Sequence, residues 1–100
     1  MALRSWTPLF MVIERFPPGG APAVYAHLAA HGRGLPEGLA FVGSWVEAGL
    51  ERAFQLMEAD DVGLLQEWVL HWRGLAAFEI VPVVPGAETR ALVERVAGTG

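Results

Sequence analysis

Four polar side chains stand one to each of four otherwise mainly apolar segments, and together they have the chemistry of a small-molecule site. They are Glu14, Ser44, Gln55 and Glu79. Two carboxyls, a hydroxyl and an amide can orient a ligand inside an apolar wall. A carboxyl buried in such a wall has a raised pKa, which suits a general acid or base. We take these four residues as candidate ligand-binding residues.

The segments that carry them are predicted to be β-strands. They cover residues 9–16, 39–46, 52–58 and 78–84 and are rich in β-branched and aromatic residues. Side chains alternate between the two faces of a strand, and both sets are apolar in these segments. A β-bulge would reverse the alternation beyond it.

We assign the four polar residues to the face that the helices leave open. With them we place Phe10, Val12, Phe16, Ala40, Val42, Val46, Ala53, Met57, Val81 and Val83. The face covered by helices then carries Leu9, Met11, Ile13, Leu39, Phe41, Trp45, Phe54, Leu56, Phe78 and Ile80. An alternative is that the four polar residues only bond one another or water inside a filled interface.

Helices are predicted between and after the strands. They cover residues 22 to about 32, 61 to about 75, and 87–96. The order βαββαβ predicts a ferredoxin-like α+β domain with a four-stranded antiparallel sheet. Its first and third strands are central, and both main helices lie on one face. We expect one domain over residues 1–100, with a core at about 9–84 and a short helix and tail at 85–100.

Composition favours self-association and excludes several other partners. Apolar residues make up 53% of the chain and charged residues 18%, against about 45–50% and about 25% in typical domains. We therefore expect a homodimer through the open sheet face. No apolar run is long enough to span a membrane, and the first residues lack the apolar stretch of a signal peptide. The seven basic residues are scattered, so nucleic-acid binding is not expected. The absence of cysteine fits the cytoplasm.

Other residues with chemical potential have simpler structural interpretations. His27 and His31 have the spacing of a two-histidine metal pair. They lack a third ligand nearby, so we expect neither a metal nor a cofactor. Trp68 and Trp72 lie in the apolar stripe of their helix and should be core residues. Arg33 either holds its loop through an ion pair with Glu37 or contacts an anionic ligand.

The chain also resembles a small bacterial family known as the domain of unknown function number 3303. The resemblance rests on MVIERF at residues 11–16, GRGLPEGL at 32–39, SW at 44–45, FQLME at 54–58, EW at 67–68, HW at 71–72 and FEIVPV at 78–83. It spans about residues 10–84 and implies a dimeric α/β barrel, in which two ferredoxin-like sheets close face to face. It implies no activity and no catalytic residues.

Three functions are compatible with these features. The first is binding of a small, mainly apolar molecule in a cavity on the open face, oriented by the four polar residues. The second is a cofactor-free enzyme of monooxygenase or isomerase type in the same cavity, with Glu14 or Glu79 as the base. The third is a structural dimer with a filled interface and no site.

Overall fold

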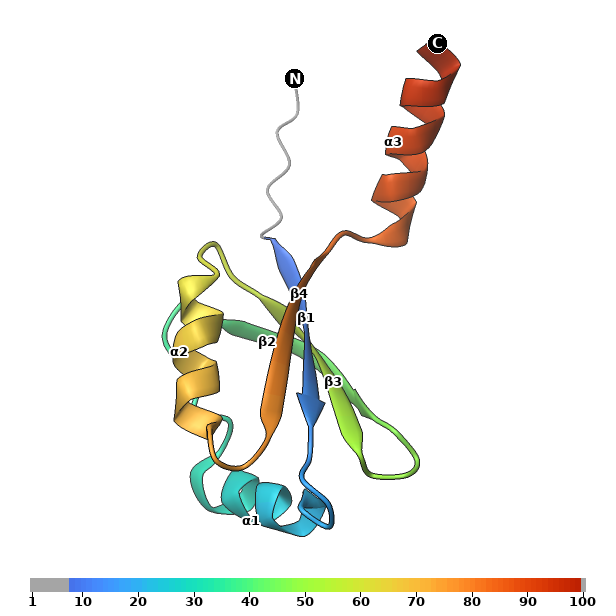
Figure 1. The fold of residues 1–100 in the computed structure, drawn as a ribbon. Helices are drawn as coiled ribbons and strands as arrows, with labels where there is room; N and C mark the ends of the chain where they lie inside the picture. The colour runs from blue at the N-terminus through green and yellow to red at the C-terminus, as the bar shows by residue number, and fades with distance from the viewer. Residues whose placement is uncertain (1–7, 100) are drawn as a thin grey trace.

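The computed structural model describes residues 8–99 and has the predicted order of elements (Figure 1). In chain order these are β1 (Leu9–Arg15), α1 (Ala21–His31), β2 (Ala40–Val46), β3 (Arg52–Glu58), α2 (Gly63–Trp72), β4 (Ala77–Val83) and α3 (Gly86–Thr99). The strands pair antiparallel in the order β2-β3-β1-β4. The ferredoxin-like α+β fold is therefore confirmed, with β1 and β3 central.

Local chemistry explains where the helices begin and end. Pro22 stands in the first turn of α1, where a missing backbone N–H costs nothing. The N–H of Gly32 closes that helix by donating to the carbonyl of Leu28 at 2.8 Å. At the start of α2, Oδ1 of Asp61 accepts a hydrogen bond from the N–H of Gly63 at 2.8 Å.

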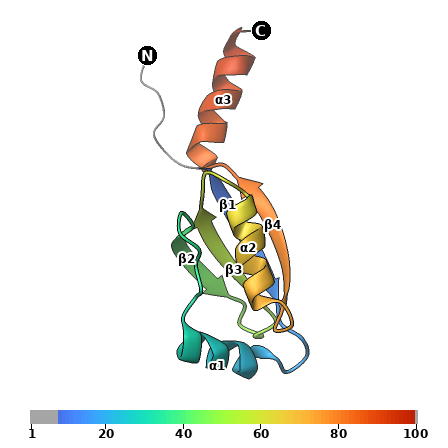
Figure 2. The ribbon, with the colours of Figure 1, turned by 90° about the vertical axis from the view of Figure 1, so that its left-hand side faces the viewer.

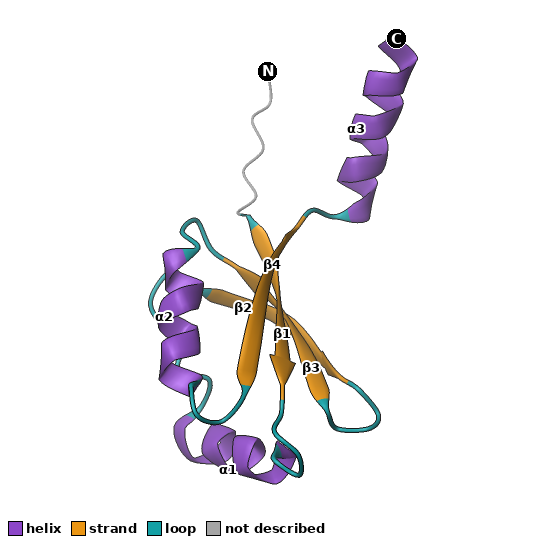
Figure 3. Cartoon of the chain, viewed as in Figure 1, coloured by secondary structure: helices purple, strands orange, loops and turns teal. Residues whose placement is uncertain are grey.

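The helices are not spread evenly over the sheet. Figures 1 and 2 show α2 lying along one face, whereas α1 lies across the end of the sheet and α3 projects beyond its other end. The same arrangement, coloured by element type, appears in Figure 3. Val24 and Leu28 of α1 still reach the core. Both main helices pack on the same side of the sheet, as predicted, with α2 along it and α1 across its end.

The core lies between α2 and the sheet. Its largest fully buried side chains are Trp68, Met57, Leu65 and Val12. The predicted stripe of α2 is confirmed, since Leu65, Trp68 and Trp72 are buried and Leu64, Val69 and Leu75 pack against them. Burial of such large apolar side chains supplies about 1.5–3 kcal/mol each, which anchors α2 on the sheet.

The face assignment was wrong for β1 and β3. Phe10, Val12 and Glu14 are buried under the helices, as are Ala53, Gln55 and Met57 opposite them. The open face carries the alternate set, which is Leu9, Met11, Ile13, Phe54 and Leu56. Both sets are largely apolar, so hydrophobicity could not distinguish them. We had placed the polar residues away from the helices, whereas a buried hydrogen-bond network holds them beneath the helices.

On the two edge strands the assignment was partly right. In β4, Phe78 and Ile80 pack on the core, whereas Glu79, Val81 and Val83 lie on the open face, as predicted. In β2 the register shifts between Phe41 and Gly43, and this irregularity reverses the alternation. Phe41, before the irregularity, packs on the core as predicted. After it the faces are exchanged: Ser44 lies opposite Gln55 on the covered face, and Trp45 lies opposite Phe54 on the open face, where it is 57% exposed.

Candidate functional site

A hydrogen-bonded relay of three polar side chains lies between the sheet and the helices. Gln55 donates from Nε2 to Oε1 of Glu14 at 2.9 Å. Its own Oε1 accepts a hydrogen bond from Nη1 of Arg33 at 3.1 Å. Glu14 on β1 and Gln55 on β3 are diagonal neighbours, because Gln55 stands opposite Val12 and Glu14 opposite Ala53. Two central strands and one loop thus bring three polar groups together.

Burial has the largest effect on the pKa of Glu14. Only 4% of this residue is exposed, and removal from water raises the pKa of its carboxyl above 4.5. The hydrogen bond from Gln55 and the charge of Arg33 act in the opposite direction and lower that pKa, but burial is the largest cause. Glu14 is therefore easier to protonate than an exposed glutamate, and its neutral form can donate a hydrogen bond.

Arg33 is held by both tryptophans of α2. Its backbone carbonyl accepts hydrogen bonds from Nε1 of Trp68 and from Nε1 of Trp72, each at 2.8 Å. Its guanidinium carbon lies 3.6 Å from the centre of the Phe41 ring, a cation–π contact. The backbone around Arg33 needs glycine, since Gly32 and Gly34 both have φ of 68°. The main chain fixes this residue, which leaves its side chain free to reach Gln55.

The predicted ion pair of Arg33 with Glu37 does not form in the described part of the chain; the guanidinium bonds Gln55 instead. We recognised Arg33 as a loop residue but not as part of the site. A usable signal was present. Trp68 and Trp72 are spaced i, i+4, so their indole N–H groups project from one helix face. Buried indole N–H groups need an acceptor, and the nearby glycine-flanked loop supplies it.

A cavity of about 60 Å³ adjoins the relay, counted as space open to the centres of water molecules. One water needs roughly 10–15 Å³ by this measure, so the cavity has room for a few waters or a short chain. Its wall is mainly apolar and aromatic, with four polar residues. It is lined by Glu14, Phe16, Val24, Tyr25, Leu28, Arg33, Ser44, Val46, Ala53, Gln55, Trp68 and Trp72.

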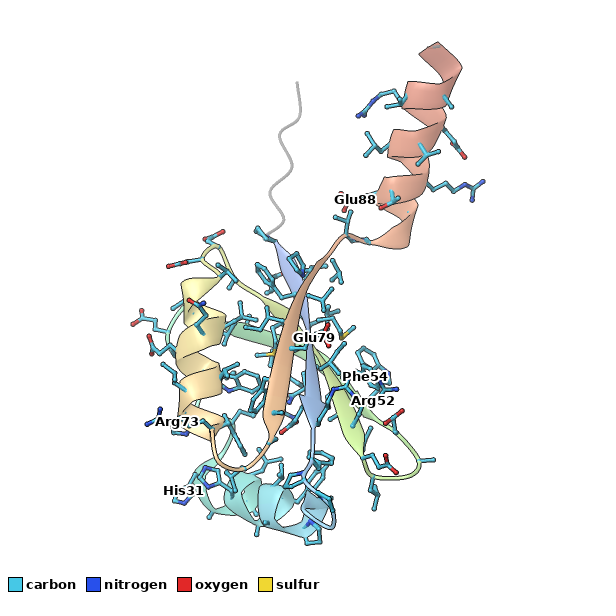
Figure 4. The ribbon with its side chains drawn as sticks, viewed as in Figure 1. His31, Arg52, Phe54, Arg73, Glu79 and Glu88 are labelled. Atoms are coloured by element: carbon cyan, nitrogen blue, oxygen red, sulfur yellow. The ribbon has the colours of Figure 1, made fainter. Side chains whose placement is uncertain are left out.

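Three of the four predicted site residues meet in this cavity. Glu14, Ser44 and Gln55 line it, with Ser44 directly opposite Gln55 in the sheet. Glu79 does not, because it lies on the open face, where an oxygen of its carboxylate is 3.9 Å from a nitrogen of Arg15. Figure 4 shows Glu79 with Arg52 and Phe54 on the side of the sheet away from α2. The cavity thus lies on the opposite side of the sheet from the one we predicted.

The three histidines gather where α1 meets α2. The ring centre of His27 lies 4.5 Å from that of His31 and 6.1 Å from that of His71. Within residues 8–99, no group of three or more histidine, cysteine, aspartate or glutamate side chains is arranged to hold a metal. The same residues contain no helix long and apolar enough to cross a membrane.

The chemistry open to the cavity is recognition of a polar head group beside an apolar chain. Arg33 supplies donors, Ser44 supplies a donor and acceptors, and Glu14 supplies either according to its protonation. A carboxyl with a raised pKa is also the group that a general acid requires. The aromatic wall contacts the rest of a ligand through its hydrophobic surface.

The chain matches the protein-family model described as "Domain of unknown function (DUF3303)" over residues 8–97. The match extends through most of α3, beyond residue 84, where our resemblance ended. No curated protein and no solved structure matches the chain.

Proposed function

We propose a ligand for this chain, which belongs to the DUF3303 family of domains of unknown function. The ligand is a small, mainly apolar molecule with one polar head group. The binding place is the cavity between the sheet and the helices. One observation carries this proposal, namely that a buried relay of Arg33, Gln55 and Glu14 lines a cavity that is otherwise apolar. A few convergent polar groups in an apolar wall are the usual composition of a ligand site.

The charges of the site favour a neutral head group. Arg33 would attract an anion, but Glu14 would repel it whenever its carboxyl is ionised. A cation would be attracted by the ionised carboxyl of Glu14 but repelled by the guanidinium of Arg33. A neutral hydroxyl or amide can donate to one of these groups and accept from another, which leaves no charge unpaired.

The size of the cavity limits the apolar part. About 60 Å³ open to water centres accommodates a short aliphatic chain, whereas drug-sized ligands need about 300 Å³ or more. Longer molecules would have to displace α1 or the loop of residues 32–38. We therefore expect affinity to rise with chain length and then to fall.

Calorimetric titration with primary alcohols from butanol to octanol tests this proposal. We expect saturable binding, strongest at an intermediate length, with a negative heat-capacity change from buried apolar surface. Gln55→Leu should weaken binding, because it removes the centre of the relay. Glu79→Gln is the matched control on the open face and should bind normally. Absence of saturable binding by any alcohol, or equal weakening by both variants, would contradict the proposal.

We also propose that the chain forms a homodimer through its open sheet face. Three large apolar side chains of the central strand, Leu9, Met11 and Ile13, lie on this face beside Phe54 and Leu56. Val42 and Trp45 at its edge are more than half exposed. A contiguous apolar patch of this kind is typical of an interaction surface, and a second copy supplies a matching one.

A further inference from the structure

All three histidines of the chain lie in one cluster beside the cavity. His27 and His31 belong to the second half of α1, and His71 belongs to the last turn of α2. The ring of Trp72 lies among them, with its centre 4.7 Å from that of His27 and 6.2 Å from that of His71. Figure 4 shows His31 of α1 near the C-terminal end of α2, where Arg73 follows the helix.

Trp72 joins this histidine cluster to the relay. One side of its ring system contacts His27, while its Nε1–H donates to the carbonyl of Arg33. The guanidinium of Arg33 in turn donates to Gln55, which donates to Glu14. A movement of α1 away from α2 would therefore shift Trp72 and Arg33. It would thereby change the hydrogen bonds of Gln55 at the polar end of the cavity.

The loop that carries Arg33 also touches the histidine cluster directly. A Cβ atom added to Gly34 would lie 2.5 Å from Nε2 of His71. The backbone of Gly34 and the imidazole of His71 are thus closely packed. A change in the charge or position of His71 acts on the residue next to Arg33 in the chain.

The surroundings accommodate neutral imidazoles better than charged ones. Nε2 of His27 is buried without a hydrogen-bond partner among the described residues. Burial, followed by the proximity of His31 and His71, lowers the pKa of His27. Each added proton brings like charges within a few ångströms of one another.

Neighbouring charges offer the histidine cluster little compensation. On α2, Glu67 lies one turn before His71, and Arg73 follows the end of the helix. Arg33 and Glu37 belong to the loop after α1. Throughout residues 8–99 no ion pair joins a histidine to a carboxylate. Arg33 adds a further positive charge on the cavity side.

We propose that the histidine cluster is a pH-operated latch on the cavity. With neutral imidazoles, α1 and the loop of residues 32–38 stay on α2, and Arg33 holds the head group of the ligand. In mild acid the charged imidazoles repel one another, α1 and the loop separate from α2, and the ligand is released. This regulation rests on the proposed binding function, and it uses histidine as the side chain that changes charge near neutral pH.

Calorimetric titration of the full chain with hexan-1-ol at about pH 7.5 and about pH 5.5 tests the latch, since these values bracket the ordinary histidine pKa. We expect binding about tenfold weaker at the lower pH, within the usual range of coupling between sites. The double variant His31→Gln, His71→Gln changes two exposed residues and should lose most of this difference. Glu51→Gln, which removes an exposed carboxyl between β2 and β3, is the control and should keep it. A double variant with the full pH difference would overturn the proposal, because repulsion among the three imidazoles would then not be the cause.

A second measurement separates failure of the latch from failure of the binding function. Protection of the Trp72 indole N–H against hydrogen exchange, measured without ligand, should fall between the same two pH values in the wild-type chain but not in the double variant. If hexan-1-ol binds at neither pH while protection falls, the binding function is wrong, and only the pH-driven separation of α1 from α2 stands. If hexan-1-ol binds equally at both and protection is constant, the latch is wrong and the binding function stands.

Discussion

Gln55 bonds Glu14 and Arg33 at the same time, and so connects a buried carboxyl to a guanidinium through one amide. The two hydrogen bonds are 2.9 Å and 3.1 Å long. A primary amide suits this position because it carries both a donor and an acceptor. The amide satisfies each group while separating the two charges, so Glu14 is subject chiefly to burial and its pKa rises.

Glu14→Gln should stabilise the protein at neutral pH. The pKa of Glu14 is higher in the folded state than the ordinary 4.5 of the unfolded state. Its favourable contribution is therefore complete below about pH 4.5 and is lost as the pH rises through the folded-state value. The neutral amide keeps the shape and the acceptor for Gln55 without that loss. A gain of about 1 kcal/mol would raise the melting temperature by roughly 4–8 °C.

Thermal unfolding of both proteins from pH 4 to pH 8 measures this effect. The gain should be small at pH 4 and should grow with pH. A variant that is destabilised at pH 8 but not at pH 4 would show that Glu14 is ionised and stabilised by Arg33. Should a catalytic activity be found, its survival in Glu14→Gln would remove Glu14 as the acid or base.

Trp68→Phe and Trp72→Phe should each cost more than the lost ring volume, because each removes a donor to the Arg33 carbonyl. A hydrogen bond contributes about 0.5–1.5 kcal/mol. The double variant leaves that carbonyl with neither indole donor, so its cost should exceed the sum of the two single costs. Urea denaturation measures all three. Leu70→Ala, at a 60% exposed position on α2, is the control and should change stability by about 0.5 kcal/mol or less. Strictly additive costs would mean that the two indoles act independently.

Gly34→Ala should destabilise the chain more than Gly32→Ala. Both glycines have φ of 68°, so both variants carry the same backbone strain, about 1 kcal/mol. Only at Gly34 does the new methyl meet a neighbour, Nε2 of His71 at 2.5 Å, while Gly32 has nothing within 4 Å. Chemical denaturation should show a difference of about 1–3 kcal/mol from overpacking.

A double variant separates the contact from the strain. His71→Ala should remove most of the extra cost of Gly34→Ala and leave the cost of Gly32→Ala unchanged. Equal costs at the two glycines in the wild-type background would contradict the close packing of the loop on His71.

Met11→Glu should convert the proposed homodimer to a monomer. Met11 lies at the centre of the open face, with Leu56 and Val81 as its partners in the sheet. A charge there would be desolvated in a face-to-face dimer, at a cost of several kcal/mol, but would stay hydrated in a monomer. Sedimentation velocity should show a dimer for the wild type and a monomer for this variant. Leu70→Glu, at a position 60% exposed on α2, should remain dimeric. A monomeric wild type at micromolar concentration would contradict the dimer.

The fold could be predicted because its signals are local. Runs of β-branched and aromatic residues marked the strands, the 3.6-residue period marked α2, and Pro-Gly runs marked the breaks. The bounds of β3 agree at both ends. The position of α1 at the end of the sheet could not be read, because a helix stripe reports what is buried and not which part of a sheet it meets.

Three of the polar members of the candidate site could be predicted, but not its location. Glu14, Ser44 and Gln55 do come together, because one polar residue per apolar strand is a readable pattern. Their face was not readable, since a buried polar residue costs little once a partner satisfies it. Arg33, that partner, comes from a loop whose path depends on two glycines and on indole groups distant in the sequence. The irregularity in β2 does have a mark in the sequence, which our face assignment did not use: Gly43 interrupts the strand at that point, and a glycine inside a strand often accompanies a bulge.

An NMR titration with hexan-1-ol, following the indole N–H signals assigned by Trp→Phe variants, tests the central claim most directly. Trp68 and Trp72 line the cavity under the helices, whereas Trp45 lies on the open face. We predict saturable shifts at Trp68 and Trp72 with one dissociation constant, and none of comparable size at Trp45. Shifts confined to Trp45, or no saturable shift at any of the three, would contradict a ligand site between the sheet and the helices.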